Sequence, residues 1–478
     1  MTLRAGAAAR DISPGQPLAL FGYPHVERIS TGIHDPLLAT VVVLRNGRET
    51  AVMASMDLLM VEPPFARDLR GSVARALGVP EACVLIGCTH THSAPVTSRM
   101  LSWSGDATIP EPDAVYLDFV KRQTVAAAAT AAESVKPAEL LWTHADATGV
   151  GGNRLRRDGV TDPECGIMAL RNAQTKAIFA VSLIYGMHPT VLHEDSTLVS
   201  SDFPHYARLH LRECLGEGVT VLYHTAPCGN QSPRYCVSGQ SFTEAERLGR
   251  KLGAAAAGAL RGTRDADWCA APRLDAALAP VVLPRRPLQS LPAARALLED
   301  YRKTFARLKA EGAPRPEIRT AECAVFGAEG TVGLAEAEAH GAIEKILARY
   351  APIEIQVLSI GDVNIVGLPG ECFTDYALAI KRAAGTRTFV VSLVNGELQG
   401  YIVTPEASAA GGYEATNAVF APEAGGVLVE TALAMVGRHG RHGAVRDVEQ
   451  RHTSLYRHSL FTAAIKSQAN GTTERVGQ

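Results

Sequence analysis

The sequence has 478 residues, of which 46% are hydrophobic and 20% are charged, and its formal net charge is −2. This composition is typical of a soluble globular protein, and the near-neutral charge gives no electrostatic basis for binding nucleic acid or an anionic membrane. No apolar run is long enough to cross a bilayer, so we expect no transmembrane segment.

The N-terminal stretch MTLRAGAAARDISPG has no apolar core of the kind that a secretory signal requires. The nine cysteines are odd in number and include no CxxC pair, and several lie in or beside apolar stretches. This usage is typical of free thiols in a reducing compartment and disfavours a thiolate zinc site. We therefore expect a cytoplasmic protein.

Apolar runs and segments with helical periodicity alternate along the chain. Asn46-Gly47 is typical of a turn between two strands, and Ser241 and Glu244 have capping-box spacing ahead of a helix. In chain order, the predicted elements are strands at 39–44 and 50–57, a helix at 64–77, a strand at 82–90, a helix at 113–135, a strand at 177–188, a helix at 203–216, a strand at 218–226, a helix after 241, helices at 292–311 and 334–349, a strand–turn–strand at 353–371, a helix to 384 and a strand at 388–395.

This order predicts an α/β (mixed α+β) fold. We expect one large domain over residues 1–440, with a mixed β-sheet core flanked by helices. The region 270–352 contains prolines and charged helical segments, which indicate an accessory helical insertion. The last segment, 441–478, is polar and is expected to form a C-terminal tail.

The stretch LIGCTHTHSAP at 85–95 ends an apolar run with two histidines. Residues i and i+2 of a strand point to the same face, so His90 and His92 face one cavity if the strand geometry continues. One interpretation is that the strand delivers two imidazoles to a metal. The alternative is a strand end that carries polar residues without a ligand.

Three further polar residues follow apolar runs: His188, Ser232 and Glu371. Nitrogen and carboxylate ligands suit zinc, and a catalytic zinc site keeps one coordination position open for water. Each residue alone also has an ordinary structural role as a rim histidine, a turn serine or a helix-capping carboxylate. Spacing does not choose between these residues and the competing histidines, which are His25, His34, His193, His205 and His224.

Seven short motifs occur in the order CTHTHSAP, GGNR, GMHPT, SSDFP, GNQSP, GLPGE and QGYIVT…GGYEA. In this order they resemble the catalytic, N-terminal domain of the neutral/alkaline ceramidase family, and the likeness covers residues 5 to 435. In that family the domain carries one catalytic zinc and hydrolyses the amide of an N-acylated sphingoid base.

The resemblance implies a role for each matching residue. One Zn²⁺ per chain is expected, and His92 is similar to the catalytic histidine of the family. Ser232 matches a serine interpreted either as a nucleophile or as a substrate contact, and we assign it to substrate binding because the sequence shows no adjacent base. The remaining roles implied by the resemblance are zinc binding by His90, His188, Glu371 and Tyr401, and substrate polarisation by Arg154 and Tyr413.

Two departures from the family affect the expected substrate. Neutral ceramidases carry an additional C-terminal β-sandwich domain, and PEASAAGG replaces their aromatic-rich segment between the two tyrosines. We therefore expect a different substrate pocket, with long-chain ceramide as a poor substrate.

The expected function is zinc-dependent hydrolysis, by metal-activated water, of an amide (N-acyl) bond in a small or lipid-like substrate. A zinc-dependent esterase or lactonase is the alternative, because the same site can attack either carbonyl, and a catalytically inactive binding module is the third. The expected partner is a small-molecule or lipid-like amide or ester, and the sequence leaves homo-oligomerisation open.

Overall fold

The structure is a computed structural model that describes residues 2–439. Residues Met1–Met435 form one compact unit, and a second unit comprises Val436–Gln478. The polar tail expected at 441–478 lies outside the described residues. None of the helices in the described part of the chain combines the length and apolar character needed to cross a membrane.

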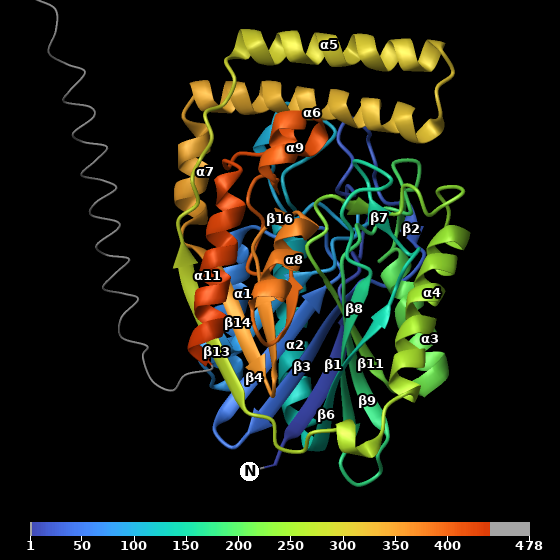
Figure 1. The fold of residues 1–478 in the computed structure, drawn as a ribbon, viewed down its shortest axis with the longest axis vertical. Coiled ribbons are helices and arrows are strands. Elements are labelled where there is room, and N and C mark those ends of the chain that lie inside the picture. Colours follow the sequence, from blue (N-terminus) through green and yellow to red (C-terminus); the bar gives the residue numbers. More distant parts are fainter. Residues whose placement is uncertain (1, 440–478) are drawn as a thin grey trace, which may run out of the picture. The chain divides into compact units, whose positions relative to one another are not determined.

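An eight-stranded mixed sheet forms the centre of the first unit (Figure 1). The pairs β4–β5 and β9–β11 are parallel, and the other neighbouring pairs are antiparallel. In sheet order the strands are β11 (Thr220–Thr225), β9 (Ile178–Tyr185), β8 (Glu164–Asn172), β6 (Lys136–Asp146), β1 (Arg4–Asp11), β3 (Leu38–Asn46), β4 (Glu49–Met56) and β5 (Val84–Cys88).

A second sheet of four strands packs on one face of the first sheet. Leu44 and Met53 of the large sheet share a buried apolar cluster with Leu358, Ile365 and Phe389 of the small sheet. In sheet order its strands are β13 (Leu274–Val281), β14 (Ile353–Ile360), β15 (Val363–Gly367) and β17 (Arg387–Val391).

Helices cover the opposite face of the large sheet. One buried cluster joins its strands to the apolar sides of α1 and α2, and another joins them to α3 and α4. Helix α8 contacts β17 of the small sheet, so the layers run helix, sheet, sheet, helix. These helices are α1 (Pro63–Leu77), α2 (Ala114–Glu133), α3 (Phe203–Leu215), α4 (Phe242–Arg261) and α8 (Thr374–Ala383).

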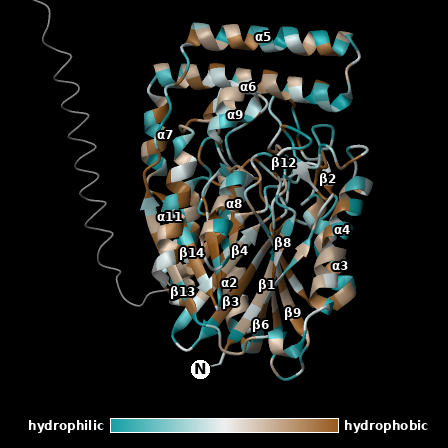
Figure 2. Cartoon of the chain, viewed as in Figure 1, coloured by the Kyte–Doolittle hydropathy of each residue, from teal (hydrophilic) through white to brown (hydrophobic). Residues whose placement is uncertain are grey.

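The segment expected to form an accessory insertion, 270–352, contains strand β13 and three helices. Two of them, α5 and α6, lie side by side beyond one end of the strands (Figure 1). Hydrophilic residues are frequent along α5, whereas the strands of the sheets are mostly hydrophobic (Figure 2). The helices of this segment are α5 (Leu291–Ala310), α6 (Arg315–Ala339) and α7 (Ala342–Tyr350), and the later helices are α9 (Pro405–Ala410), α10 (Tyr413–Thr416) and α11 (Glu423–His439).

The expected α/β fold, with a mixed sheet flanked by helices, is confirmed. Short two-stranded pairings lie beyond the ends of the long strands. They are β2 (Gly32–Ile33) with β10 (Leu198–Val199), β7 (Gly152–Asn153) with β12 (Gln231–Ser232), and β16 (Glu371–Cys372) with β18 (Tyr401–Ile402).

A buried ion pair joins the end of β4 to helix α3. Asp57 and Arg208 are 0% and 2% exposed, and both carboxylate oxygens accept hydrogen bonds from the guanidinium at 2.7 Å. Replacing Arg208 by Met leaves the Asp57 carboxylate buried without its counter-ion. We expect Arg208→Met to lower the free energy of unfolding by about 3–5 kcal/mol, measured by urea denaturation at neutral pH.

The matched control is Arg122→Met, which removes an exposed arginine paired with Asp118 one helical turn away. Exposed pairs contribute about 0–1 kcal/mol, so this control should change stability little. Equal losses from the two substitutions would contradict the proposed importance of the buried pair.

Candidate metal centre

His90 lies just beyond β5, in a turn. Strand β5 ends at Cys88 and the φ of His90 is 71°, in the left-handed region that side chains other than glycine seldom adopt. The assumption that strand geometry continues through His-Thr-His is therefore wrong, although the turn still brings the rings of His90 and His92 together, with centroids 5.1 Å apart. Such backbone conformations in non-glycine residues cluster at functional sites.

The ring of His90 is held by a main-chain contact on one side. Its Nδ1 donates to the carbonyl oxygen of Leu59 at 2.9 Å, and its Nε2 lies 3.1 Å from Oε2 of Glu371. His90 is 1% exposed. Because a carbonyl oxygen only accepts, Nδ1 carries a proton, and in this tautomer Nε2 presents a lone pair.

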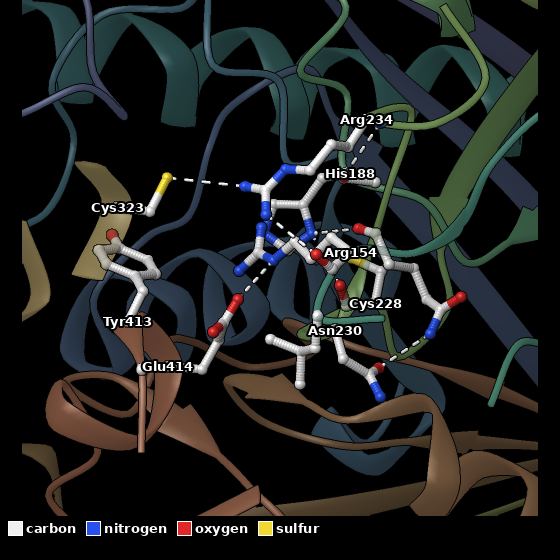
Figure 3. Close-up of polar contacts among 12 residues, drawn as sticks. Arg154, His188, Cys228, Asn230, Arg234, Cys323, Tyr413 and Glu414 are labelled. Carbon is white, nitrogen blue, oxygen red and sulfur yellow. Dashed lines mark hydrogen bonds and ion pairs between the residues drawn. The ribbon is translucent and has the colours of Figure 1, made fainter. Parts of the chain in front are cut away.

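His188 follows strand β9 and repeats this arrangement. Its Nδ1 donates to the carbonyl oxygens of Cys228 at 2.7 Å (Figure 3) and Gln231 at 3.0 Å. Its Nε2 lies 3.2 Å from the same Oε2 of Glu371. Burial, and then the nearby Arg154 and His90, lower the pKa of His188 to about 3. The ring is therefore neutral at pH 7.

The three atoms that converge here fit a cation. Burial opposes ionisation of Glu371, and with the Nδ1 protons of His90 and His188 fixed on main-chain carbonyls, their Nε2 atoms present lone pairs to the carboxylate. Two lone-pair nitrogens facing one carboxylate oxygen repel each other unless a positive charge lies between them. Imidazole nitrogen and carboxylate suit zinc, and an Nδ1–H bonded to a carbonyl is the usual outer contact of a metal-binding histidine.

His92 offers a further lone pair at the same place. Its Nδ1 donates to the carbonyl oxygen of Gly22 at 3.1 Å, and its Nε2 is buried without a partner in the described part of the chain. Burial, and then His90 and His188, lower the pKa of His92 well below its usual value. Ring nitrogens of the three histidines lie within 4.8 Å of one another, so this cluster also has metal-binding geometry.

Gly22 is required for this position of His92. The φ of Gly22 is 106°, and a Cβ atom there would lie 2.3 Å from Nδ1 of His92. Only glycine allows the backbone to approach the ring closely enough for the hydrogen bond.

Two tyrosines form the wall beside the histidines. Strands β16 and β18 pair in parallel, with Glu371 opposite Tyr401, and the Tyr401 and Tyr413 rings lie 5.7 Å apart between centroids. Burial raises the pKa of Tyr401 well above its usual value, and Glu371 adds to the effect. Tyr401 is therefore a neutral phenol unless a cation binds its oxygen.

Arg154 lies against the same wall. Its Cζ is 5.5 Å from the centre of the Tyr401 ring, and its Nε donates to Glu414 at 2.6 Å (Figure 3). Burial would lower the pKa of Arg154, but Glu414, Tyr401 and Glu371 raise it well above its usual value. Its Nη2 is buried and has no acceptor among residues 2–439, so it can donate to a ligand oxygen.

Ser232 lies at the edge of a large cavity. Strand β12 places it opposite Gly152, and its Oγ accepts from the main-chain N–H of Arg234 at 3.2 Å. A nucleophilic serine needs a histidine or carboxylate beside its hydroxyl to accept the proton. Within the described residues, no such group forms a hydrogen bond with the Ser232 hydroxyl. The geometry agrees with substrate contact better than with nucleophilic attack.

The structure brings all eight predicted residues together. A cavity of about 950 Å³ is lined by His92, Arg154, Ser232, Tyr401 and Tyr413. A small adjoining pocket of about 20 Å³ is lined by His90 and Glu371 as well as three of these residues. His188 contacts Glu371 behind this pocket.

The competing histidines do not belong to the three-histidine cluster. His25 pairs with Glu329, His193 pairs with Glu194, and His224 is buried without a hydrogen-bond partner in the part of the chain described. His34 and His205 both lie beside Asp35.

Sequence reasoning missed several residues of the site. Gly22, Arg234 and Glu414 were not singled out, and neither was helix α6, which lines the cavity through Arg319 and Phe326 among others. The glutamate in GGYE, next to Tyr413, was the one available signal for Glu414.

Neither a scan against protein-family models nor a search of curated proteins finds a match. The fold is similar to the crystal structure of neutral ceramidase from Pseudomonas aeruginosa, with a TM-score of 0.69 and 18% identity over 92% of this chain and 75% of that chain. A solved structure of ceramidase complexed with C2 gives a TM-score of 0.70 and 18% identity over 92% of this chain and 76% of that chain. The chain therefore has a neutral ceramidase-like fold, as its motifs indicated.

Proposed function

We propose that the protein is a zinc-dependent hydrolase that cleaves an amide (N-acyl) bond of a small or lipid-like substrate. One zinc per chain is held by His90, His188, Glu371 and Tyr401. The observation that carries the proposal is the convergence of two imidazole Nε2 atoms on one buried carboxylate oxygen, at 3.1 and 3.2 Å. This donor set has the composition of catalytic zinc sites, which use histidine and carboxylate ligands.

Zinc, when bound, polarises a carbonyl and lowers the pKa of a bound water to about 7. His92 supplies the proton transfer. Its Nδ1–H is held by Gly22, so its Nε2 is free to accept a proton from the attacking water and to deliver it to the leaving nitrogen. A positioned acid–base group of this kind contributes about 10²- to 10⁴-fold to the rate.

Arg154 and Tyr413 stabilise the oxyanion that forms at the former carbonyl. The unpartnered Nη2 of Arg154 is a permanent donor, and burial keeps the Tyr413 phenol protonated by raising its pKa. Removing one such donor typically costs about 3 kcal/mol of transition-state stabilisation. Ser232 lines the same cavity, next to the Arg154 segment, and contacts the bound substrate there.

The volume and lining of the cavity indicate the size of substrate that it can hold. Its volume of about 950 Å³ accommodates a ligand larger than a single amino acid. The segment PEASAAGG forms α9 and the loop after it, and contributes small residues such as Ala407, Ala410 and Gly411 to the lining. These residues support the expectation that the substrate differs from long-chain ceramide.

The first prediction here concerns the metal. We expect one zinc per chain by elemental analysis of purified protein, and loss of that zinc in His188→Ala, because this ring is buried against Glu371. His205→Ala, which removes a histidine outside the site, is the control and should keep the metal. Metal-free wild-type protein after zinc loading would overturn the proposal.

The second prediction separates His92 from the ligands. His92→Ala should retain zinc and lose about 10²- to 10⁴-fold in kcat, because a proton-transfer group is removed and the ligand set is kept. Metal content and turnover are measured on the same sample. Loss of zinc together with turnover would show that His92 is a ligand, as the three-histidine cluster also allows.

A matched substrate panel tests the reaction. The zinc-loaded enzyme is assayed with an amide, an ester and a lactone of equal acyl length, and with a long-chain ceramide. We expect the short amide to have the highest kcat/KM. Turnover of the ester or lactone alone would establish the esterase or lactonase alternative, and zinc binding without any turnover would indicate a binding module.

A further inference from the structure

The large cavity contains an arginine without a counter-ion. Five arginines line it, and three of them have carboxylate partners in the structure. These pairs are Arg154 with Glu414, Arg156 with Asp158, and Arg319 with Glu194. Of the other two, Arg315 is exposed, whereas Arg234 is half-buried and lies two residues beyond Ser232.

Arg234 is held in place by neutral groups. Its Nη1 donates to the carbonyl oxygen of Arg154 at 2.9 Å and to Oγ1 of Thr320 at 3.1 Å. Its Nη2 contacts Sγ of Cys323 at 3.6 Å (Figure 3). Thr320 and Cys323 belong to α6, so the guanidinium lies between the catalytic wall and the helix that covers the cavity. No carboxylate of residues 2–439 lies within ion-pair distance of it.

One edge of this guanidinium remains available. Both contacts to oxygen use Nη1, Nε makes no hydrogen bond within the described residues, and Nη2 has only a thiol sulfur, which is a weak acceptor. Nε–H and Nη2–H point in parallel along one side of the planar group. This edge matches the two oxygens of a carboxylate in a bidentate pair.

The other charges of the cavity do not neutralise Arg234. Asp375 accepts a hydrogen bond from the amide of Asn230 at 2.9 Å, and Glu406 is an exposed residue in the first turn of α9. The positive charge therefore stays on the β12 and α6 side of the lining. A purely structural link to Thr320 and Cys323 would not require a charged group, because both of these acceptors are neutral.

We propose that Arg234 binds a carboxylate of the substrate, so that the preferred substrate is an amide that also carries a carboxylate group. This inference rests on the proposed function, because it assigns the substrate class of the same cavity. The contact of Arg234 with the main chain of Arg154 places the anion site beside the reacting amide. The carboxylate can belong to the amine side or to the acyl side of the amide.

Kinetics with matched substrates test the proposal and distinguish these two sources. N-octanoylglycine is compared with N-octanoylglycinamide for the amine side, and the monoethylamide of suberic acid is compared with octanoyl ethylamide for the acyl side. We expect the acid to exceed its neutral match in kcat/KM by about tenfold or more in one pair, the usual size of a charge-assisted bidentate contact. An advantage below fivefold in both pairs overturns the proposal.

Variants assign the preference to Arg234. Arg234→Gln should reduce the ratio of acid to neutral substrate to about one, and Arg234→Lys should keep part of it, because lysine retains the charge but loses the paired donors. Arg156→Gln is the control, since it removes a cavity arginine that Asp158 already neutralises, and should keep the wild-type ratio. Equal losses for acid and neutral substrates in Arg234→Gln would show a structural role and overturn the proposal.

Binding to the metal-free wild-type protein provides a test that depends neither on turnover nor on a variant. By calorimetry, N-octanoylglycine should bind at least fivefold more tightly than N-octanoylglycinamide, and the difference should shrink at high salt. Equal affinities overturn the proposal. If the zinc-loaded enzyme cleaves none of the four amides, the proposed function fails, while this binding result, repeated with Arg234→Gln, still decides whether Arg234 forms an anion site.

Discussion

The site depends on the contact between Glu371 and two histidines. Main-chain carbonyl oxygens fix the proton on Nδ1 of His90 and of His188, and so turn both Nε2 lone pairs toward one carboxylate oxygen. Within the protein alone this arrangement is unfavourable, because it sets acceptors against acceptors in a buried space. The fold therefore favours the binding of a cation at this place. The main-chain carbonyl oxygens around the histidines set the tautomers that produce this arrangement.

The surrounding elements position this contact from several parts of the chain. His90 follows the edge strand β5, His188 follows β9, and Glu371 is placed by the short pairing of β16 with β18. Strands β5 and β9 both belong to the large sheet, whereas the β16–β18 pairing follows β15 of the small sheet. The distances among the ligands therefore depend on how this short pairing is placed beside the ends of the large-sheet strands. The backbone strain at His90, with its positive φ, is supported by the buried main-chain contacts on both sides of the residue.

Much of the fold follows from local patterns, and the rest depends on tertiary contacts. The strands β3, β4, β9 and β11 are mostly apolar runs and were predicted. Strand β1 (RAGAAARD) is instead rich in alanine and has no pattern that indicates a strand. Helix α6 was predicted only at its end, because its glycines and β-branched residues weaken the helical signal. The candidate residues were identified through motifs, since spacing alone did not separate His90 and His188 from the other histidines.

Within the cavity too, some residues were predictable from sequence motifs and others are placed only by tertiary contacts. The residues near the proposed metal lie in recognisable motifs. The groups proposed to select the substrate, such as Arg234, were not singled out by any motif. Arg234 is oriented by the main chain of Arg154 on one side and by α6 on the other, and neither contact is visible in the sequence. Helix α6 also contacts two further segments of the chain, where Arg319 pairs with Glu194 and Glu329 pairs with His25. A single long helix thus contributes to the cavity lining, whereas none of the four proposed zinc ligands belongs to it. We therefore expect changes in α6 to alter the shape and charge of the substrate space more than the ligand geometry.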